Sequence, residues 1–232
     1  MGNTMKICGL DPSISSTGKT IMELDTDTFA IKDVRFYGYC DTKIRCMVDN
    51  RLEIIHTGSK YSKLSIVERQ HIAYNILDVD MEDVKFVSFE GYAFSKVRKA
   101  SGANSRGMMQ LGEFIGSMKY RYYCMRKGIV VYPSTTVKKL ATGDGTADKI
   151  KMQSQLKYDY PDFYHPYLDN ITKWENPCSD IADSFWICEA LRLHMKYDVL
   201  GSEAMTEVEL AAVQGHTAKS EPITETPIII ME

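Results

Sequence analysis

The chain has 232 residues, of which 44% are hydrophobic and 25% are charged, close to the average for globular proteins. This composition excludes a wholly disordered chain, a collagen and a coiled-coil rod, and the apolar runs are too short to cross a bilayer. The formal net charge of −3 hides an asymmetry, because residues 95–157 contain thirteen Lys/Arg and three Asp/Glu, a balance of +10. A strongly basic segment therefore lies between acidic flanks.

The first residues of the chain and its cysteines indicate where in the cell the protein is located. The first ten residues contain one lysine and no apolar segment of signal-peptide length. The six cysteines include no CxxC pair, which is typical of reduced thiols rather than of a disulfide framework or a zinc site. We therefore expect a cytoplasmic protein that does not associate with a membrane.

The first half of the chain is predicted to contain four strands and one helix. Strands are expected over 5–11, 20–24 and 29–40, with a turn over 12–18 and a loop over 41–61. Ser65 and Glu68 form a capping-box pattern, which predicts the start of a helix. A further strand over 85–90 ends on Glu90.

The second half is mostly helical. A glycine-, serine- and Lys/Arg-rich loop over 91–107 precedes a helix over 108–127, a strand over 129–132, helices over 134–141 and 147–158, and a last helix over 179–200. Residues 201–232 contain no aromatic residue and gain Glu, Thr and Pro, so we expect an acidic, flexible tail that packs weakly or not at all. The order of elements predicts one α/β domain over 1–200 with a mixed sheet.

Four acidic residues stand where a buried element would not place them. Asp11 ends the first strand, and Glu90 ends a later one. Asp180 and Asp183 lie in the first turn of the last helix, where three residues at ~100° each place them on one face, about 60° apart. The rest of that turn is apolar, and a buried carboxylate must be paired, neutralised or bound to a metal. Asp11 alone could open a turn, and Asp180 or Asp183 alone could start a helix, whereas Glu90 at the end of an apolar strand is harder to explain structurally.

If the two strands are neighbours, the four carboxylates would meet at one edge of the sheet. All-oxygen ligation suits Mg²⁺ or Mn²⁺ rather than zinc. Two such ions could activate a water and stabilise the leaving oxygen in phosphodiester hydrolysis. The pattern is therefore compatible with a metal-dependent hydrolase.

The basic segment supplies candidates for phosphate binding through a salt-sensitive attraction that does not depend on base sequence. They are Lys96, Arg98, Lys99 and Arg106 after Glu90, and Lys138, Lys139, Lys149 and Lys151 after the strand over 129–132. Tyr92 and Phe94 interleave with the first group and could stack on bases, although packing in a core explains them equally well. Charge clusters are also often no more than solvated faces.

Four motifs together resemble the RuvC family, the Holliday junction resolvases of the RNase H-like superfamily. The motifs follow one another in the family's order, over about residues 5–195. They are Gly9-Leu10-Asp11-Pro12-Ser13 with Thr17-Gly18, Phe89-Glu90, Val137-Lys138-Lys139 with Thr142-Gly143-Asp144-Gly145 and Ala147-Asp148-Lys149, and Asp180-Ile181-Ala182-Asp183-Ser184. Each motif is weak alone, whereas the set of four is fairly specific.

The resemblance implies an RNase H-like α/β fold, with a mixed five-stranded sheet flanked by helices. It also implies a homodimer that resolves four-way DNA junctions by paired, symmetric, Mg²⁺-dependent nicking and leaves 5′-phosphate ends. The helix over 108–127 corresponds to the helix on the family's dimer side, although core packing alone would also explain its apolar stripe.

The resemblance also assigns roles to single residues. The family's four metal-binding carboxylates, which hold two Mg²⁺ per site with Mn²⁺ as a substitute, correspond to Asp11, Glu90, Asp180 and Asp183. Lys149 and Lys138 match lysines that the family places near the scissile phosphate, where Lys149 would stabilise negative charge.

The chain also departs from the family's pattern. Family members place a junction-wedging aromatic residue three positions after the glutamate, and this position is Ala93, between Tyr92 and Phe94. The interval from Asp11 to Glu90 is longer than in typical bacterial members, and the acidic tail is extra. Both departures suggest a divergent, phage-encoded member working in a bacterial or phage-infected cell. The tail could dock a replication or recombination protein through residues 227–232.

Other protein classes share parts of the pattern. The opening motif also resembles the first phosphate loop of actin-like ATPases and sugar kinases, but these need a second such domain, for which 232 residues is short. A 3′–5′ exonuclease or an RNase H would use the same carboxylates on linear, branched or hybrid duplexes. A non-catalytic DNA-binding relative would keep the fold, and the intact set of carboxylates speaks against it.

Overall fold

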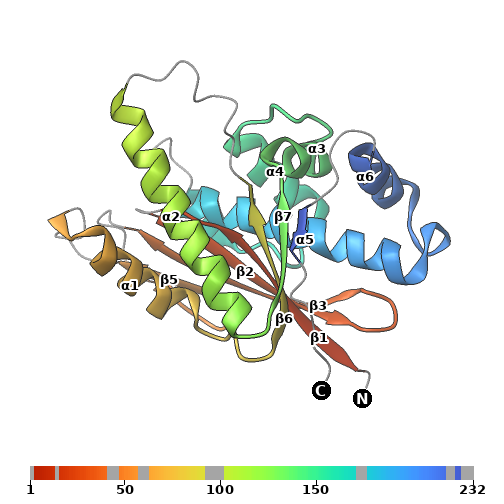
Figure 1. Ribbon diagram of the computed structural model, residues 1–232. Coiled ribbons are helices and arrows are strands. Elements are labelled where there is room, and N and C mark those ends of the chain that lie inside the picture. The colour runs from red at the N-terminus through yellow and green to blue at the C-terminus, as the bar shows by residue number, and fades with distance from the viewer. Residues whose placement is uncertain are drawn as a thin grey trace.

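A mixed β-sheet forms the centre of the computed structural model (Figure 1). The structure describes residues 3–13, 16–40, 47–56, 63–91, 102–170, 177–217 and 223–225, and the statements below concern these residues. Within them the sheet has eight strands, in the order β4-β5-β3-β2-β1-β6-β7-β8. The strands are β1 (Thr4–Asp11), β2 (Ser16–Asp25), β3 (Ile31–Cys40), β4 (Met47–Val48), β5 (Leu52–His56), β6 (Val84–Glu90), β7 (Gly128–Tyr132) and β8 (Ile223–Glu225).

The five central strands lie where the apolar runs of the sequence predict them, but β2 begins at Ser16, so the predicted turn over 12–18 is wrong from residue 16 onward. β1, β2 and β3 pair antiparallel, whereas β6 is parallel to β1 and β7 is parallel to β6. The predicted total of five strands is too low, because β5 pairs parallel with β3, β4 pairs antiparallel with β5, and β8 pairs antiparallel with β7. The prediction of a loop over 41–61 is therefore wrong for β4 and β5.

Helices cover both faces of the sheet (Figure 1). One face carries α1 (Ile66–Leu77) and α2 (Gly102–Cys124), and the other carries α3 (Ser134–Thr142), α4 (Lys149–Asp159) and α5 (Cys178–Leu200). Two short 3₁₀ helices, η3 (Pro166–Asn170) and η4 (Ser202–Ala204), and the helix α6 (Glu207–Thr217) complete the described elements. No helix within these ranges is long and apolar enough to cross a membrane.

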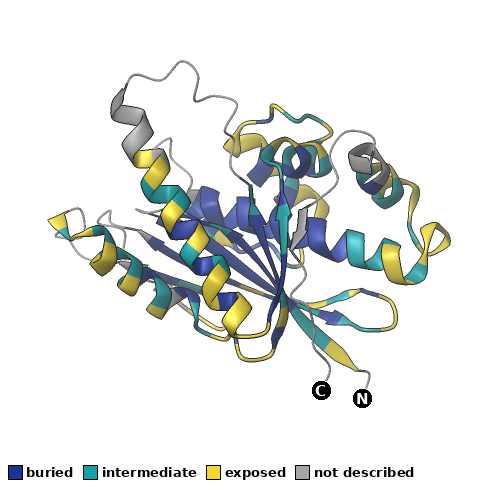
Figure 2. Cartoon of the chain, in the orientation of Figure 1, coloured by how far each residue is buried: buried dark blue, intermediate teal, exposed yellow. Residues whose placement is uncertain are grey.

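The central strands are apolar on both faces, and this is why they are covered on both sides. Along β1, Ile7 packs with Phe185 and the α5 side, whereas Cys8 packs with Tyr122 and the α2 side. This alternation is the period-2 pattern of a strand. Residues 178–193 of α5 are all buried (Figure 2), because this half of the helix lies between the sheet and α4. Its hydrophobic pattern is accordingly not one-sided.

One helix boundary confirms the sequence-based expectations, and one corrects them. Ser65 and Glu68 form the predicted capping box at α1, with Glu68 accepting from the Ser65 backbone N–H at 2.8 Å. α2 begins at Gly102 rather than at 108. The sequence did not predict its first turns because Gly102, Asn104, Ser105 and Gly107 are weak helix formers.

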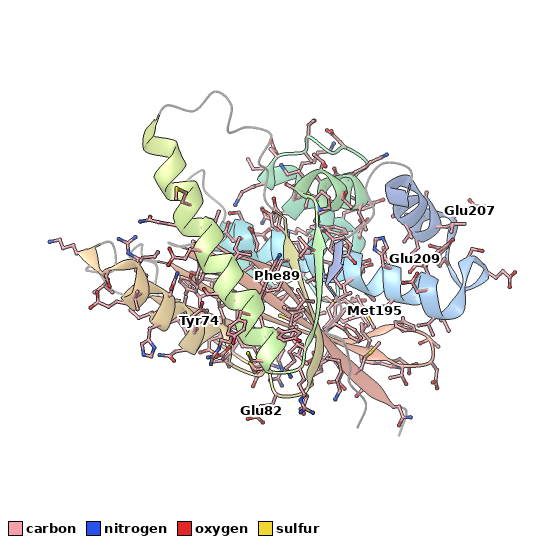
Figure 3. The ribbon with its side chains drawn as sticks, in the orientation of Figure 1. Tyr74, Glu82, Phe89, Met195, Glu207 and Glu209 are labelled. Carbon is pink, nitrogen blue, oxygen red and sulfur yellow. The ribbon has the colours of Figure 1, made fainter. Side chains whose placement is uncertain are left out.

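Part of the predicted flexible tail is helical and docked. α6 lies against α5 (Figure 3), where Glu209 accepts from Arg192 at 3.1 Å and from Lys196 at 2.7 Å. The expectation of a weakly packed tail is therefore wrong for 207–217. The predicted domain boundary at residue 200 stays a prediction.

Candidate active site at the start of α5

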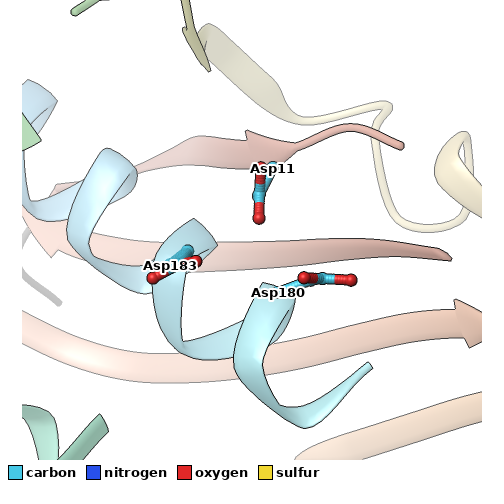
Figure 4. A group of neighbouring side chains, drawn as sticks. All are labelled: Asp11, Asp180 and Asp183. Atoms are coloured by element: carbon cyan, nitrogen blue, oxygen red, sulfur yellow. The ribbon is translucent and has the colours of Figure 1, made fainter. Parts of the chain in front are cut away.

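Three carboxylates from distant parts of the chain meet at the start of α5. Asp11 comes from the last position of β1, and Asp180 and Asp183 come from the first turns of the helix (Figure 4). One oxygen of each lies within 4.8 Å of an oxygen of the others. The predicted meeting of the first strand with the acidic turn of the last helix is thus present in the structure.

Two glycines allow the helix to lie directly on the sheet at this point. A Cβ on Gly9 would lie 2.5 Å from the backbone nitrogen of Cys188, and a Cβ on Gly18 would overlap the backbone carbonyl of Asp180. Gly18 is the strand partner of Asp11. Any larger residue at either position would lift α5 away from β1 and β2 and so separate the carboxylates.

Asp180 and Asp183 are buried, with 4% and 9% of their surface exposed. Their three-residue spacing places both on the face of α5 that points toward Asp11 (Figure 4). The side chains between and after them are apolar and buried among core residues. A helix start alone would not require buried aspartates, because a capping carboxylate works equally well in water.

Glu90 is the fourth acidic residue at this edge. β6 runs parallel to β1 with Phe89 opposite Leu10, so Glu90 follows at the same edge of the sheet as Asp11. Its charge acts on both Asp11 and Asp183. Its oxygens are not within the 4.8 Å group formed by the three aspartates.

The electrostatics of this site resist full ionisation. Burial, followed by the negative charges of Asp180, Asp183 and Glu90, holds the pKa of Asp11 well above its usual range. Burial also raises the pKa of Asp183 to about 7, with Lys149 opposing the shift and Glu90 adding to it. Like charges in a poorly solvated place disfavour the ionised state, so the carboxylates lack sufficient positive charge from the protein itself.

Lys149 is the cation that contacts this group. Its Nζ lies 2.5 Å from Asp180 Oδ1 and 3.7 Å from Asp183 Oδ2, and it donates to Ser179 Oγ at 3.4 Å. Although partial burial opposes the shift, the charges of Asp180, Asp11 and Asp183 raise the pKa of Lys149 above its usual value. Lys138 acts more weakly, through its charge on Asp183. We call Asp11, Glu90, Asp180 and Asp183, together with Lys149, the acidic cluster.

Ser16 is a member of the site that the sequence did not single out. Its hydroxyl, on the first residue of β2, donates to Asp180 Oδ2 at 2.5 Å, and the side chain is 2% exposed. The available signal was its place in the Ser/Thr-rich run after Asp11. That run is equally typical of a turn, so composition could not separate the two roles.

The remaining predicted DNA-binding residues lie elsewhere or outside the described ranges. Lys151 is exposed and pairs with Asp144 at 3.4 Å. Lys139 lines a groove of about 520 Å³ between α3, α4 and α6. Five predicted residues lie outside the described residues, as does the side chain of Arg106: they are Tyr92, Phe94, Lys96, Arg98 and Lys99.

The donor set of the acidic cluster fits a hard divalent cation. Its carboxylates offer only oxygen ligands, and four carboxylates with one lysine leave a formal charge of −3. No histidine or cysteine takes part in the three-aspartate group. Such a set suits Mg²⁺ or Mn²⁺ and does not suit zinc.

Comparison with known proteins supports the fold. No family model and no curated protein sequence matches the chain. Among solved structures, Thermus thermophilus RuvC matches with a TM-score of 0.51 and 16% identity, over 85% of this chain and 98% of that one. The fold is that of RuvC. A structure of the same protein in complex with a Holliday junction substrate matches with the same TM-score and identity, over 97% of its chain.

A second protein matches to a similar degree. The yeast mitochondrial Holliday junction resolvase Ydc2 aligns with a TM-score of 0.50 and 13% identity, over 88% of this chain and 85% of that one. The predicted α/β, RNase H-like fold class is thereby confirmed. The TM-scores of 0.51 and 0.50 show that the chain shares its fold with RuvC and with this resolvase.

Proposed function

We propose that the protein is a divalent-metal-dependent endonuclease that resolves four-way DNA junctions by paired symmetric nicking. The observation that carries the proposal is the acidic cluster, which lies at the sheet edge of a RuvC fold with more negative charge than the protein itself balances. A buried excess of carboxylates is unfavourable unless it binds a cation. Similarity to two resolvases of the same fold supports the choice of substrate.

Asp11, Asp180 and Asp183, with Glu90, are the residues that would hold Mg²⁺, or Mn²⁺ in its place. When bound, such ions lower the pKa of a water and stabilise charge on phosphate oxygens. Ser16 keeps Asp180 in place, and the packing of Gly9 and Gly18 against α5 keeps Asp180 and Asp183 close to Asp11. The chain thus supplies a preorganised set of oxygens.

Lys149 and Lys138 would act on the DNA. The Lys149 side chain is 52% exposed and reaches the cluster from the first residue of α4. Its Nζ is therefore within reach of a phosphate that approaches the carboxylates, where it would neutralise developing negative charge. Lys138 lies close enough to act on Asp183 and would serve the same phosphate from α3.

Paired cuts require two active sites, and the proposal includes a homodimer that leaves 5′-phosphate ends. α2 carries large exposed side chains that support an interface on this helix: Met109, Tyr120 and Tyr123 are 75%, 71% and 50% exposed. The balance of +10 over residues 95–157 supports a polyanionic partner.

The test uses the purified full chain with Mg²⁺ and end-labelled four-way, flap and linear DNA. Nicks at symmetric positions, confined to the four-way substrate and carrying 5′-phosphates, are expected. Cutting of flaps or of RNA–DNA hybrids at equal rates would instead indicate an RNase H-like nuclease of another specificity. Tight binding without any cutting would indicate a non-catalytic relative.

The Asp11→Asn variant tests the carboxylate assignment. It keeps the size of the side chain and removes one charge from the cluster. Nicking should fall by more than about 100-fold, because loss of an outer-shell partner alone costs about 10–100-fold. Junction binding in a gel-shift assay without metal should persist. A variant that nicks at the normal rate would contradict the carboxylate assignment.

A further inference from the structure

Two buried hydrogen bonds connect β2 to α5, and they differ in one respect. Ser16 donates to Asp180 at 2.5 Å, and the hydroxyls of Thr20 and Ser184 are hydrogen-bonded at 2.8 Å. Ser16 and Thr20 are four residues apart on β2, as are Asp180 and Ser184 on α5, and all four side chains are buried. Only the Ser16 bond ends on a carboxylate of the acidic cluster.

The Ser16 bond fixes which oxygen of Asp180 faces the cluster. Asp180 Oδ2 accepts from Ser16, and Oδ1 accepts from Lys149, whose Nζ also reaches Asp183. A hydroxyl that donates to a carboxylate forms a short, charge-assisted bond. Ser16 therefore holds one oxygen against β2 and leaves the other toward Asp183.

Ser16 is itself held in place by its neighbours. The Thr17 hydroxyl donates to the Ser13 carbonyl at 3.0 Å and accepts from the Ser13 backbone N–H at 3.1 Å. The Tyr39 hydroxyl donates to the same carbonyl at 2.8 Å. On the other side of Ser16, Gly18 packs on the backbone of Asp180. The hydroxyl therefore reaches Asp180 from a backbone that is fixed at both ends.

We propose that Ser16 is a positioning residue, whose hydroxyl holds the Asp180 carboxylate in the orientation that binds the divalent cation. The proposal rests on the metal-dependent function above. Without the hydroxyl, only the contacts of Oδ1 with Lys149 and Ser179 would oppose rotation of Asp180 away from the like charges of Asp11 and Asp183. Cation affinity would then fall, because the oxygen would have to be ordered at the moment of binding.

Isothermal titration of the full chain with Mn²⁺ tests this, with no DNA present. Ser16→Ala should weaken Mn²⁺ binding by about 10–100-fold, the usual effect of losing a partner that orients a ligand. Ser16→Thr keeps the hydroxyl and should restore affinity to within about 3-fold of wild type. Ser16→Cys, a weaker donor, should fall between them, and it decides the matter if the alanine variant does not fold.

Thr20→Val is the matched control, because it removes the Thr20–Ser184 bond between β2 and α5 without touching a carboxylate. Ser184 still donates to the Ile181 carbonyl at 2.7 Å. This variant should bind Mn²⁺ like wild type. Equal weakening in Ser16→Ala and Thr20→Val would attribute the effect to packing and overturn the proposal.

The two levels of the proposal fail in different ways. If the wild-type chain binds Mn²⁺ and folded Ser16→Ala binds it equally well, the role of Ser16 is refuted and the metal site stands. If the wild-type chain binds no Mn²⁺, the metal-dependent function is refuted, and the role of Ser16 with it.

Discussion

α5 carries two groups of buried charge whose balance differs. The acidic cluster at its start holds four carboxylates and one contacting lysine. A second group, which we call the α5–α6 charge network, begins at Glu189, six residues or about 9 Å along the helix from Asp183. It consists of two acids and two bases, Glu189, Arg192, Lys196 and Glu209.

The α5–α6 charge network satisfies nearly every polar atom that it buries. Arg192 donates to Glu189 at 2.6 and 2.7 Å, to the Phe29 carbonyl at 3.0 Å and to Glu209 at 3.1 Å. The Tyr160 hydroxyl donates to Glu189 at 2.6 Å. Charges paired and hydrogen-bonded to this extent leave no ligand position open.

The difference between the two groups shows that burial of charge does not by itself indicate function. A balanced network connects elements, here α5 with α6 and the β2–β3 turn. An unbalanced one is unfavourable in the isolated protein and becomes favourable when a cation binds. Imbalance at a sheet edge is therefore the feature that identifies the acidic cluster as the candidate site.

Breaking the balanced network should have the largest effect. In Arg192→Met, Glu189, which is 1% exposed, loses its cation. Removing one partner of a buried pair costs about 3–5 kcal/mol, to be measured as the free energy of unfolding in urea. The double variant Glu189→Leu/Arg192→Met should regain most of this loss, because neither charge is then left alone. A loss below about 1 kcal/mol in the single variant would contradict the assigned role.

In the acidic cluster, removing a charge should instead improve stability, because there the negative charge is in excess. The pKa of Asp183 is about 7 when folded, against 3.8 for the unperturbed group. Between about pH 4 and pH 7 the folded state therefore binds more protons than the unfolded state. Its stability without metal should fall as the pH rises through this window, by at most about 1.4 kcal/mol per pH unit for one proton.

Asp183→Asn should flatten this decline. Saturating Mg²⁺ should flatten it in the wild-type protein, because the ion binds only the folded state and binds it more tightly as the carboxylates lose their protons. The measurement is urea unfolding at several pH values with a chelator and with Mg²⁺. If instead the metal-free wild-type protein and Asp183→Asn both become more stable between pH 4 and pH 7, with the same slope, the acidic cluster does not carry an excess of negative charge.

Lys19 isolates the effect of one buried charge that touches no carboxylate. It is fully buried, donates to the Leu77 and Val79 carbonyls at 3.1 and 2.6 Å, and lies 3.9 Å from the centre of the Tyr37 ring. Burial lowers its pKa to about 8 from 10.5. Between these values the unfolded state binds the proton and the folded state does not.

Lys19 should therefore make the protein more stable as the pH rises from 8 to 10.5, by about 3 kcal/mol in all. Tyrosines titrate in the same range, so the quantity to measure is the difference in unfolding free energy between wild type and Lys19→Met. This difference should shift in favour of wild type as the pH rises. If this difference in unfolding free energy does not depend on pH, the hydrogen bonds to Leu77 and Val79 and the contact with the Tyr37 ring keep Lys19 protonated.

The parts of the fold that local sequence determines could be predicted. The central strands β1, β3, β6 and β7 are apolar runs close to their observed length, and Asp11 and Glu90 end two of them. The capping box at Ser65 was readable because Glu68 follows at the required spacing, and it forms as expected. The common face of Asp180 and Asp183 follows from helical periodicity alone.

The parts that depend on distant contacts could not be predicted. β5 follows a turn in which Asp49 accepts from His165 at 2.8 Å, more than a hundred residues away in the chain. Ser16 acquires its role only because Gly18 lets Asp180 approach. α6 has an acidic, weakly patterned sequence, and it docks because Arg192 and Lys196 meet Glu209.

The smallest expected effect concerns the cap that aims Glu209 at the α5–α6 charge network. Thr206 Oγ1 accepts from the Glu209 backbone N–H at 3.2 Å, and Glu209 Oε2 accepts from the Thr206 backbone N–H at 2.9 Å. Although burial opposes the shift, hydrogen bonds from Lys196, Thr206 and Arg192 lower the pKa of Glu209 to about 2.

Thr206→Ala should therefore cost about 1 kcal/mol of stability, the usual value of an N-cap, and Thr206→Ser should cost almost nothing. Neither variant should change Mn²⁺ affinity, because the α5–α6 charge network balances itself without help from the acidic cluster. Urea unfolding and Mn²⁺ titration of the same samples separate the two readouts. A change in Mn²⁺ affinity in Thr206→Ala would mean that the two charge groups on α5 are coupled through the helix, and that their difference in balance is not independent.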